Sequence, residues 1–431
     1  MSFSDRTPKS RKLHERARKV LPGGVSYGIR ALPPYPFFVK RAKGSKVHDV
    51  DGNIYSDYWM GHGALILGHS PDPVVKAVEE QLPLGTHYGF SHEHEVELAE
   101  LIVRHVPSAE MVRYCASGTE ANLYGTRLAR AYTGRMSMLK IEGSWHGGYD
   151  SLHCYVSRPF GRLESAGLNP KTTEDTSAVP FNDLEAARRA AEREKPACVI
   201  LEPVMGAAGF ITPEPGYLEG LREICDETGA LLVFDEVVTG FRLGMGGAQG
   251  HYGVTPDLTI MGKIIGGGFP AGAFCGPEEI MERVNQAKYP KPEDRSAHGG
   301  TFTGNPVSAV AGIATIKTLK SDRVHRHIDG LGKKVRDGLR DIFGRHELPA
   351  SVTGVGSTFG VHFMPEPPRS VGDTARCDLE ATHAFFSHML DRGIVCLSPN
   401  VSHSWISGAH TAADIEEYLS ATEEFMRSYK P

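Results

Sequence analysis

The stretch ALLVFDEVVTGFRLGMGGAQGHYGVTPDLTIMGKIIGGGFPAGAF, residues 230–274, decides the fold. Two continuous apolar runs within it, LLVF and LTIM, are each followed by charged residues: Asp235 and Glu236 come after the first run, and Lys263 comes after the second. Continuous apolar runs are typical of strands that are covered on both faces, as in a parallel sheet flanked by helices. The stretch therefore predicts two strands of such a sheet, with a carboxylate and an amine at their carboxyl ends.

The same alternation of strands and helices extends upstream. The β-rich runs cover residues 111–116, 136–143 and 197–204, and the helical patterns cover residues 120–133, 183–194 and 216–228. This order predicts an α/β fold with a mostly parallel sheet. Residues 157–178 are polar and rich in turn formers, and we expect them to form a loop over a site.

The two ends of the chain have a different pattern. Residues 36–58 alternate apolar and polar side chains around the turn signal DVDGN, which predicts a small antiparallel sheet, and residues 9–21 predict a surface helix. After residue 321, helical and β-rich patterns predict a smaller α+β domain that the N-terminal segment joins in space. The predicted division is residues 1–60 and 321–431 for the small domain and residues 61–320 for the large one.

Bulk properties exclude several classes of function. The formal net charge of −5 and the pI near 6.5 leave no basic footprint for nucleic acid or an anionic membrane. No apolar run has the length of a membrane span, and the N-terminus lacks the apolar core of a secretory signal. The seven cysteines show no CxxC spacing, and the histidines, including the HEH run at residues 92–94, show no metal-ligand pattern. We expect a reduced, cytoplasmic protein without a metal site.

Three predicted strand ends carry unusual residues, and ligands of open α/β sheets bind beyond such ends. Ser117, Gly118 and Thr119 lead from a strand into a helix, where N–H groups and hydroxyls can hold a phosphate. Asp235 ends a buried strand, and Lys263 stands among apolar and glycine residues. Pyridoxal phosphate requires a phosphate site, a carboxylate facing its pyridine nitrogen and a desolvated amine. The three strand ends together predict a site for this coenzyme.

Three longer motifs resemble a known family. They are ASGTEANLYGTRLARAYTGR, LVFDEVVTGFRLGMGGAQGHYGVTPDLTIMGKIIGGGFPAGAF and GGTFTGNPVSAVAG. In this order they resemble the class III aminotransferases, which are fold-type I pyridoxal phosphate enzymes, and within them the branch that contains glutamate-1-semialdehyde 2,1-aminomutase. The resemblance implies a large α/β domain with a mostly parallel seven-stranded sheet, a smaller α+β domain from both termini, pyridoxal 5′-phosphate as coenzyme, and a homodimer with a shared active site.

The resemblance also implies roles for single residues. Lys263 would bond the coenzyme covalently and shuttle a proton, and Asp235 would face the pyridine nitrogen. Further coenzyme contacts are implied for Ser117, Gly118, Thr119, Trp145, His146, Glu202, Val237 and Thr301. Of these, Trp145 would stack on the ring with His146 near it, Glu202 would support the site through hydrogen bonds, and Thr301 would reach the phosphate of the neighbouring subunit.

The sequence departs from the aminomutase pattern at informative positions. Where the mutase has a serine, this chain has Tyr27, and where the mutase has an asparagine after EPV, this chain has Ala207 and Ala208. The glutamate that the mutase has towards its C-terminus is replaced in this chain around Ser402. Arg30 remains and is the candidate for clamping a substrate carboxylate. Without the polar partners, buried groups of a small diamino acid would stay unpaired. We therefore expect an aminotransferase that moves the amino group of a carboxylate-bearing amino acid, β-amino and D-aromatic acids included, to a 2-oxo acid.

Other functions stay open. A family aminomutase that makes 5-aminolevulinate is the nearest alternative, and a family racemase is a smaller third option. An NAD-linked dehydrogenase would need GxGxxG between a strand and a helix, which IIGGGFPAG does not offer. A non-catalytic binding protein would not need Lys263 or Asp235. The expected partners are small amino and oxo acids and a second copy of the chain.

Overall fold

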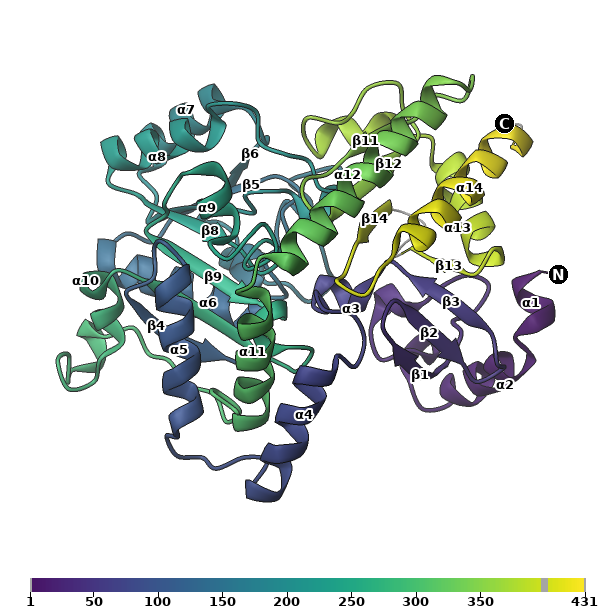
Figure 1. Cartoon of the computed structure of the whole chain (residues 1–431). Helices are drawn as coiled ribbons and strands as arrows, with labels where there is room; N and C mark the ends of the chain where they lie inside the picture. The colour runs from purple at the N-terminus through teal and green to yellow at the C-terminus, as the bar shows by residue number, and fades with distance from the viewer. Residues whose placement is uncertain (1, 397–401, 430–431) are drawn as a thin grey trace.

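A seven-stranded sheet with the strand order β4-β10-β9-β8-β7-β5-β6 forms the centre of the molecule (Figure 1). The computed structural model describes residues 2–396 and 402–429. The strands are β4 (Met111–Cys115), β5 (Met138–Ile141), β6 (Thr176–Val179), β7 (Cys198–Leu201), β8 (Leu231–Asp235), β9 (Leu258–Gly262) and β10 (Gly272–Gly276). Only β10 is antiparallel to its neighbours, β4 and β9, and the ladder from β9 to β6 is parallel. The predicted mostly parallel α/β sheet is confirmed.

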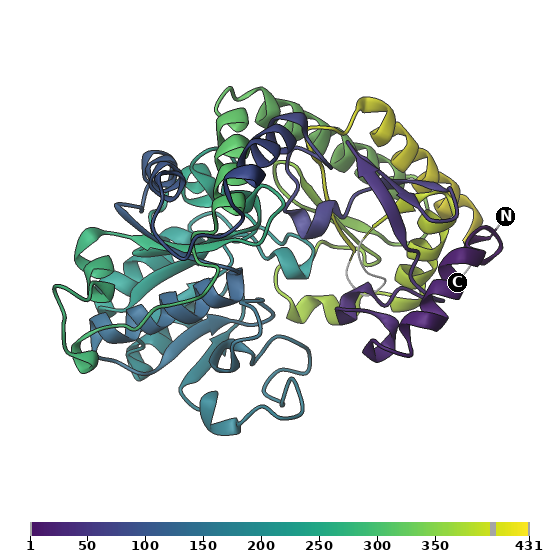
Figure 2. The same ribbon diagram turned by 90° about the horizontal axis from the view of Figure 1, so that it is seen from below.

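Helices cover both faces of this sheet, as the turned view shows (Figure 2). On one face, Leu128 of α6 (Gly118–Thr133) packs with Val233 and Ile260. Leu232 and Met261, which alternate with those residues along β8 and β9, point to the other face. That face is covered by α5 (Glu93–His105), α7 (Leu184–Glu194), α8 (Tyr217–Thr228) and α11 (Pro306–Leu319). No helix among the described residues is long and apolar enough to cross a membrane.

Two smaller sheets lie towards the chain termini. One contains β1 (Val39–Lys43), β2 (Lys46–Asp49), β3 (Ile54–Asp57) and β13 (Ile394–Val395), and the other contains β11 (Ser351–Thr353), β12 (Thr358–His362) and β14 (Ser402–Trp405). Their helices are α12 (Arg323–Gly344), α13 (Leu379–Asp391) and α14 (Ala412–Ser428). Because β13 lies parallel to β3, residues from both ends of the chain share one sheet. The division at residues 60 and 320 stays a prediction.

Several elements differ from the expectation. The loop expected over residues 157–178 ends earlier, because Thr176 begins β6 and pairs with Met138 of β5. The expected N-terminal helix is shorter, as α2 (Pro8–Ala17). The sequence did not predict α11, whose residues are buried on nearly every side, so that its pattern has no polar face to mark a helical period. The remaining helices are α1 (Phe3–Arg6), α3 (Met60–Gly63), α4 (Asp72–Gln81), α9 (Gly247–Tyr252) and α10 (Glu278–Met281).

Candidate active site

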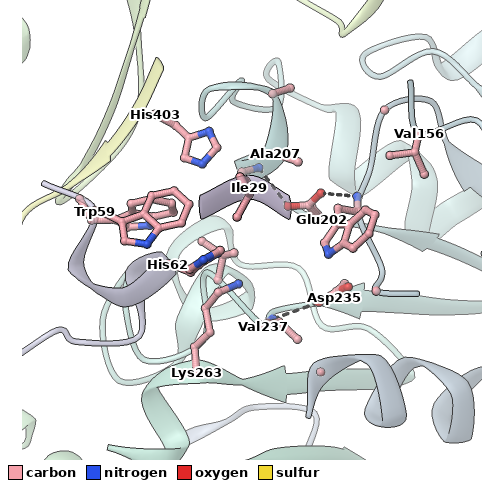
Figure 3. A pocket seen from close by; sticks show the side chains of 18 of the residues that line it. Ile29, Trp59, His62, Val156, Glu202, Ala207, Asp235, Val237, Lys263 and His403 are labelled. Carbon is pink, nitrogen blue, oxygen red and sulfur yellow. Dashed lines mark hydrogen bonds between the residues drawn. The ribbon is translucent and has the colours of Figure 1, made fainter. Parts of the chain in front are cut away.

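A cavity of about 990 Å³ lies at the carboxyl ends of the parallel strands (Figure 3). Asp235 is the last residue of β8, Lys263 directly follows β9, Glu202 directly follows β7, and all three line the cavity. Segments from the N-terminal and C-terminal parts of the chain close its other side. A cavity of this size holds a ligand as large as a coenzyme with its substrate.

Asp235 is nearly fully buried, with 3% of its surface exposed. Its Oδ2 accepts a hydrogen bond from Asn122 Nδ2 at 2.9 Å and lies 2.7 Å from His146 Nδ1, and its Oδ1 accepts the N–H of Val237 at 3.1 Å. These hydrogen bonds fix the orientation of the carboxylate at the end of β8. Asn122 was not predicted, although it lies one helical turn after Gly118 in the same motif.

Lys263 extends towards His62 from beneath the cavity (Figure 3). It begins a 3-10 turn in the left-handed region, with φ of 49°, which residues other than glycine seldom adopt. No acceptor in the described part of the chain is hydrogen-bonded to its Nζ. Burial lowers the pKa of the amine, whereas the charges of Asp235 and Glu202 act in the opposite direction. The arrangement leaves an unbonded amine whose neutral, nucleophilic form is favoured.

The amino end of α6 provides an anion site. Ser117 is the N-cap, and its Oγ accepts the N–H of Glu120 at 3.2 Å. The N–H groups of Gly118 and Thr119 belong to the first turn, where the helix offers them no acceptor, and both residues line the cavity. A Cβ atom at Gly118 would lie 3.0 Å from the Val237 side chain, so glycine lets the backbone and Val237 meet here. The predicted phosphate residues are therefore gathered at one wall.

The next predicted coenzyme contacts, Trp145, His146 and Glu202, differ in their hydrogen bonds and in whether they line the cavity. Trp145 lines the cavity, and its N–H donates to Glu202 Oε1 at 2.9 Å, while Glu202 Oε2 accepts the N–H of Gly206 at 3.0 Å. Burial, and then the charge of Asp235, raise the pKa of Glu202. The buried side chain of His146 contacts Asp235 and does not line the cavity, and a place for it beside the ring stays a prediction.

Of two further predicted site residues, Arg30 lines the cavity and Thr301 does not. Arg30, in the turn Gly28–Arg30, lines the cavity, and its Nη1 donates to Ser26 Oγ at 3.0 Å. Thr301 is exposed and does not line the cavity of its own chain. A role for Thr301 in a neighbouring subunit stays a prediction.

An aromatic wall faces Lys263 across the cavity (Figure 3). The His62 ring lies 3.9 Å from that of Trp59 and 5.7 Å from that of Tyr27, and the His403 ring lies 4.8 Å from that of Trp405. Burial lowers the pKa of His62 to about 4 and that of His403 to about 3, so both imidazoles are neutral at physiological pH. The sequence pointed to parts of this wall, such as Tyr27 and the neighbourhood of Ser402, and not to the wall as a whole, because its members come from distant segments.

These groups fit pyridoxal phosphate. Unbonded N–H groups of a helix, a buried carboxylate held by hydrogen bonds and an unbonded amine meet in one cavity. When bound, this coenzyme supplies an electron sink that stabilises negative charge at the substrate carbon. Within the described residues, no group of His, Cys, Asp or Glu side chains is placed to hold a metal ion.

Comparison with curated proteins finds full-length relatives. The glutamate-1-semialdehyde 2,1-aminomutase of Methanothrix thermoacetophila is 44% identical over 421 residues, which cover 97% of this chain and 96% of that protein. The enzyme of that name from Methanothermobacter thermautotrophicus is 44% identical over 428 residues, which cover 98% of this chain and 100% of that protein. Further relatives of the same name are 40% to 42% identical. These names support the expected aminomutase alternative better than the expected transfer between two molecules.

Solved structures share the whole fold. An omega-transaminase from Sphaerobacter thermophilus has a TM-score of 0.90 at 34% identity, and the match covers 97% of both chains. A β-phenylalanine aminotransferase from Variovorax paradoxus has a TM-score of 0.90 at 32% identity, covering 99% of this chain and 95% of that one. A glutamate-1-semialdehyde-aminomutase from Pseudomonas aeruginosa PAO1, in a lysine-to-alanine variant in complex with PMP, has a TM-score of 0.90 at 26% identity over 99% and 95% of the chains.

A family model described as "Aminotransferase class-III" matches residues 27–404. This match and the relatives confirm the family resemblance, the fold-type I architecture and the enzyme class. They also confirm pyridoxal phosphate as the coenzyme. The chain belongs to the class III aminotransferases, a family of pyridoxal phosphate enzymes.

Proposed function

We propose that this enzyme takes the amino group of a carboxylate-bearing amino acid with an aromatic or apolar side chain and passes it to a 2-oxo acid. The observation that carries the proposal is the wall of aromatic rings and neutral imidazoles opposite Lys263. An aryl side chain stacks favourably on such a wall. The carboxylates that line the cavity in the described part of the chain, Glu202 and Asp235, already accept hydrogen bonds at the coenzyme end.

Positions where the sequence departs from the aminomutase pattern support the same proposal. Tyr27, Ala207 and Ala208 line the cavity, and His403, next to Ser402, also lines it. An aminomutase has to retain a diamino compound while nitrogen moves to the neighbouring carbon. Apolar and aromatic positions would leave N–H groups of that compound unpaired, at a cost of about 1–3 kcal/mol for each group. A donor with one amine and an apolar side chain has no such cost.

Glutamate-1-semialdehyde 2,1-aminomutase activity is the second candidate. The observation that favours it is the name shared by curated relatives at 40% to 44% identity over nearly the whole chain. Both candidates use the same groups for the first half of the reaction. They differ in whether the substrate leaves before the nitrogen is returned.

We assign the following actions to the chain's own residues. The Nζ of Lys263 holds the coenzyme and, when released, removes and returns a proton at the substrate carbon. Asp235 holds a proton on the pyridine nitrogen, which keeps the bound ring electron-poor. Gly118 and Thr119 bind the phosphate through their N–H groups. Trp145 covers the ring and helps to exclude water.

The decisive experiment separates the two candidates in one assay. The pyridoxamine form is incubated with glutamate-1-semialdehyde, and the pyridoxal form with β- and D-aromatic amino acids plus 2-oxoglutarate. We expect a keto product and glutamate from the second incubation. Formation of 5-aminolevulinate from the first, without transfer in the second, would overturn the aminotransferase proposal in favour of the aminomutase.

Arg30 is proposed to bind the carboxylate of the amino donor. Its guanidinium lines the cavity and can bind a carboxylate in a bidentate manner. For Arg30→Gln we expect KM for the donor to rise about tenfold or more, since a hydrogen bond to a charged group contributes roughly 1.5–3 kcal/mol. The exposed Arg18, which does not line the cavity, is the matched control, and Arg18→Gln should leave KM unchanged. An unchanged KM in Arg30→Gln would remove this role.

We propose that two chains form a homodimer in which Thr301 completes the site of the partner. Thr301 is followed by Phe302, which is 59% exposed and contacts His87. Phe90, three residues after His87, is 85% exposed. Exposed apolar side chains of this kind mark an interface. A second copy of the chain is the proposed occupant.

Mixed dimers test this arrangement. Lys263→Ala and Thr301→Glu subunits should each be inactive alone, because the first lacks the amine and the second places a negative charge against the phosphate. After random exchange of subunits, one site of each mixed dimer is intact, so about a quarter of wild-type activity should return. No recovery in mixtures shown by mass to contain mixed dimers would contradict a shared site.

A reducing compartment, the cytoplasm, is the proposed location. All seven cysteines are free in the structure, and six of them are buried. Disulfides are common in proteins of oxidising compartments and rare in cytosolic ones.

A further inference from the structure

Lys140, in β5, is a buried lysine that the proposed reaction does not use. It is fully buried, and its Nζ donates to the carbonyl oxygens of Ser144 at 3.2 Å, Leu152 at 2.9 Å and Cys154 at 2.7 Å. These neutral oxygens are its hydrogen-bond partners in the described part of the chain. A buried lysine normally pairs with a carboxylate, so this arrangement requires another explanation.

Fixed dipoles take the place of a counterion around this ammonium. Its three protons meet three acceptors, so no proton is left unsatisfied. Burial lowers the pKa of Lys140 to about 8, with the charges of Glu202, Glu164 and Asp235 among the opposing influences. The ammonium form therefore predominates at neutral pH. A positive charge is thus held behind the coenzyme wall.

The segment that Lys140 binds, residues 144–154, contacts the other groups of the proposed coenzyme site. Trp145 donates its N–H to Glu202, and His146 Nδ1 lies 2.7 Å from Asp235 Oδ2. The N–H of Gly148 donates to Thr119 Oγ1 at 3.4 Å. Gly147 packs so closely that a Cβ atom there would lie 2.2 Å from Thr119 Oγ1. One ammonium therefore holds the segment that touches the carboxylates and the phosphate end.

The charge of Lys140 also affects the protonation state of the His146 ring. Because a carboxylate only accepts, the Nδ1 atom that faces Asp235 has to carry the proton. His146 Nε2 is buried and has no hydrogen-bond partner, so a second proton there would be an unsatisfied buried donor. Burial lowers the pKa of His146, the hydrogen bond to Asp235 and its charge act in the opposite direction, and the positive charge of Lys140 acts in the same direction as burial. His146 is thereby kept as a neutral donor to Asp235.

We propose that Lys140 is a positioning residue for the coenzyme: by binding the carbonyls of residues 144–154 it holds Trp145 and His146 against Glu202 and Asp235, and so determines how tightly the coenzyme binds and how strongly its ring nitrogen is protonated. The inference rests on the proposed roles of Asp235 and Glu202. It does not depend on which amino acid is the substrate.

The test uses Lys140→Met, which keeps the length of the side chain and removes the charge and the donors. The matched control is Arg135→Met. Arg135 Nη1 also donates to main-chain carbonyls, those of Pro196 at 3.2 Å and Thr228 at 2.9 Å, but at the amino ends of the strands. The measurements are the dissociation constant of pyridoxal phosphate, the pH midpoint of the visible absorption band of the bound coenzyme, and the thermal unfolding temperature of the coenzyme-free protein.

We expect Lys140→Met to weaken coenzyme binding by about tenfold or more, since three buried carbonyls lose their donor, and to shift the pH midpoint of the band. Arg135→Met should lower the unfolding temperature and leave both coenzyme measurements within about twofold of wild type. Lys140→Arg, which keeps charge and donors, should restore the pH midpoint at least in part. A folded Lys140→Met protein with wild-type affinity and pH midpoint would overturn the proposal.

A measurement on the wild-type protein covers the case in which Lys140→Met does not fold. Nuclear magnetic resonance of ¹⁵N-histidine protein, with the His146 signals assigned by their loss in His146→Phe, reports the proton at each ring nitrogen. We expect a neutral ring with the proton on Nδ1 at pH 7, and an imidazolium would overturn the proposal. If wild type binds the coenzyme but moves no amino group, the proposed function fails while these measurements still decide the role of Lys140.

Discussion

Replacing Lys263 with alanine is expected to abolish turnover, with a loss on the order of 10⁴-fold or more in kcat. A positioned acid–base group contributes up to about 10⁴-fold, and the same amine is also proposed to form the covalent link to the coenzyme. Among the described residues, Lys263 is the lysine that lines the cavity, and the arginines there, Arg30 and Arg158, carry guanidinium groups in place of an amine. Coenzyme binding without a covalent link remains compatible with this variant, because the N–H groups of α6 are intact.

Two measurements check this expectation. Borohydride reduction followed by mass spectrometry should give a coenzyme adduct at residue 263 in wild type and none in Lys263→Ala. The control is Lys195→Ala, since Lys195 is exposed at the end of α7 and should be dispensable. Activity of Lys263→Ala within tenfold of wild type, or an adduct at another lysine, would contradict the assignment.

Replacing Asp235 with asparagine is expected to reduce kcat by about 10³-fold or more, which corresponds to roughly 4 kcal/mol of barrier. The amide keeps the shape of the side chain but cannot hold a proton on the pyridine nitrogen, so the bound ring becomes a poorer electron sink. The substitution would also change the hydrogen bonds with Asn122 and His146, which both donate to the carboxylate in wild type. The measurement is kcat together with the visible spectrum of the bound coenzyme.

The neighbouring Glu236 is a matched control for Asp235→Asn. It is equally buried, but its carboxylate accepts hydrogen bonds from Thr239, Ala248 and Gln249 and does not line the cavity. Glu236→Gln should therefore lower stability and leave kcat per folded molecule within tenfold. An Asp235→Asn rate within tenfold of wild type, about 1.4 kcal/mol, would remove Asp235 from the mechanism.

The large sheet could be predicted from the side-chain pattern of the sequence, because its strands are apolar on both faces. The runs before Asp235 and Lys263 are fully buried strands, β8 and β9. Such runs stand out against amphipathic helices such as α8. The same rule failed for α11, which is buried nearly all round and has no polar side to mark its period. It also missed the start of β6, because a four-residue edge strand next to a loop gives a weak signal.

Thus the sequence by itself determined that Asp235, Lys263 and the turn at Ser117 lie together, because each is at or just after the end of a strand and the ends of parallel strands meet at one edge. Only the tertiary structure decided that His146 lies behind Asp235, that Thr301 is outside the cavity of its own chain, and that Lys140 binds the loop behind the site. It also brought His62 and His403 to one wall from opposite ends of the chain. The physical reason is that local patterns fix backbone conformation, whereas contacts between distant segments follow from how the sheets and helices pack together.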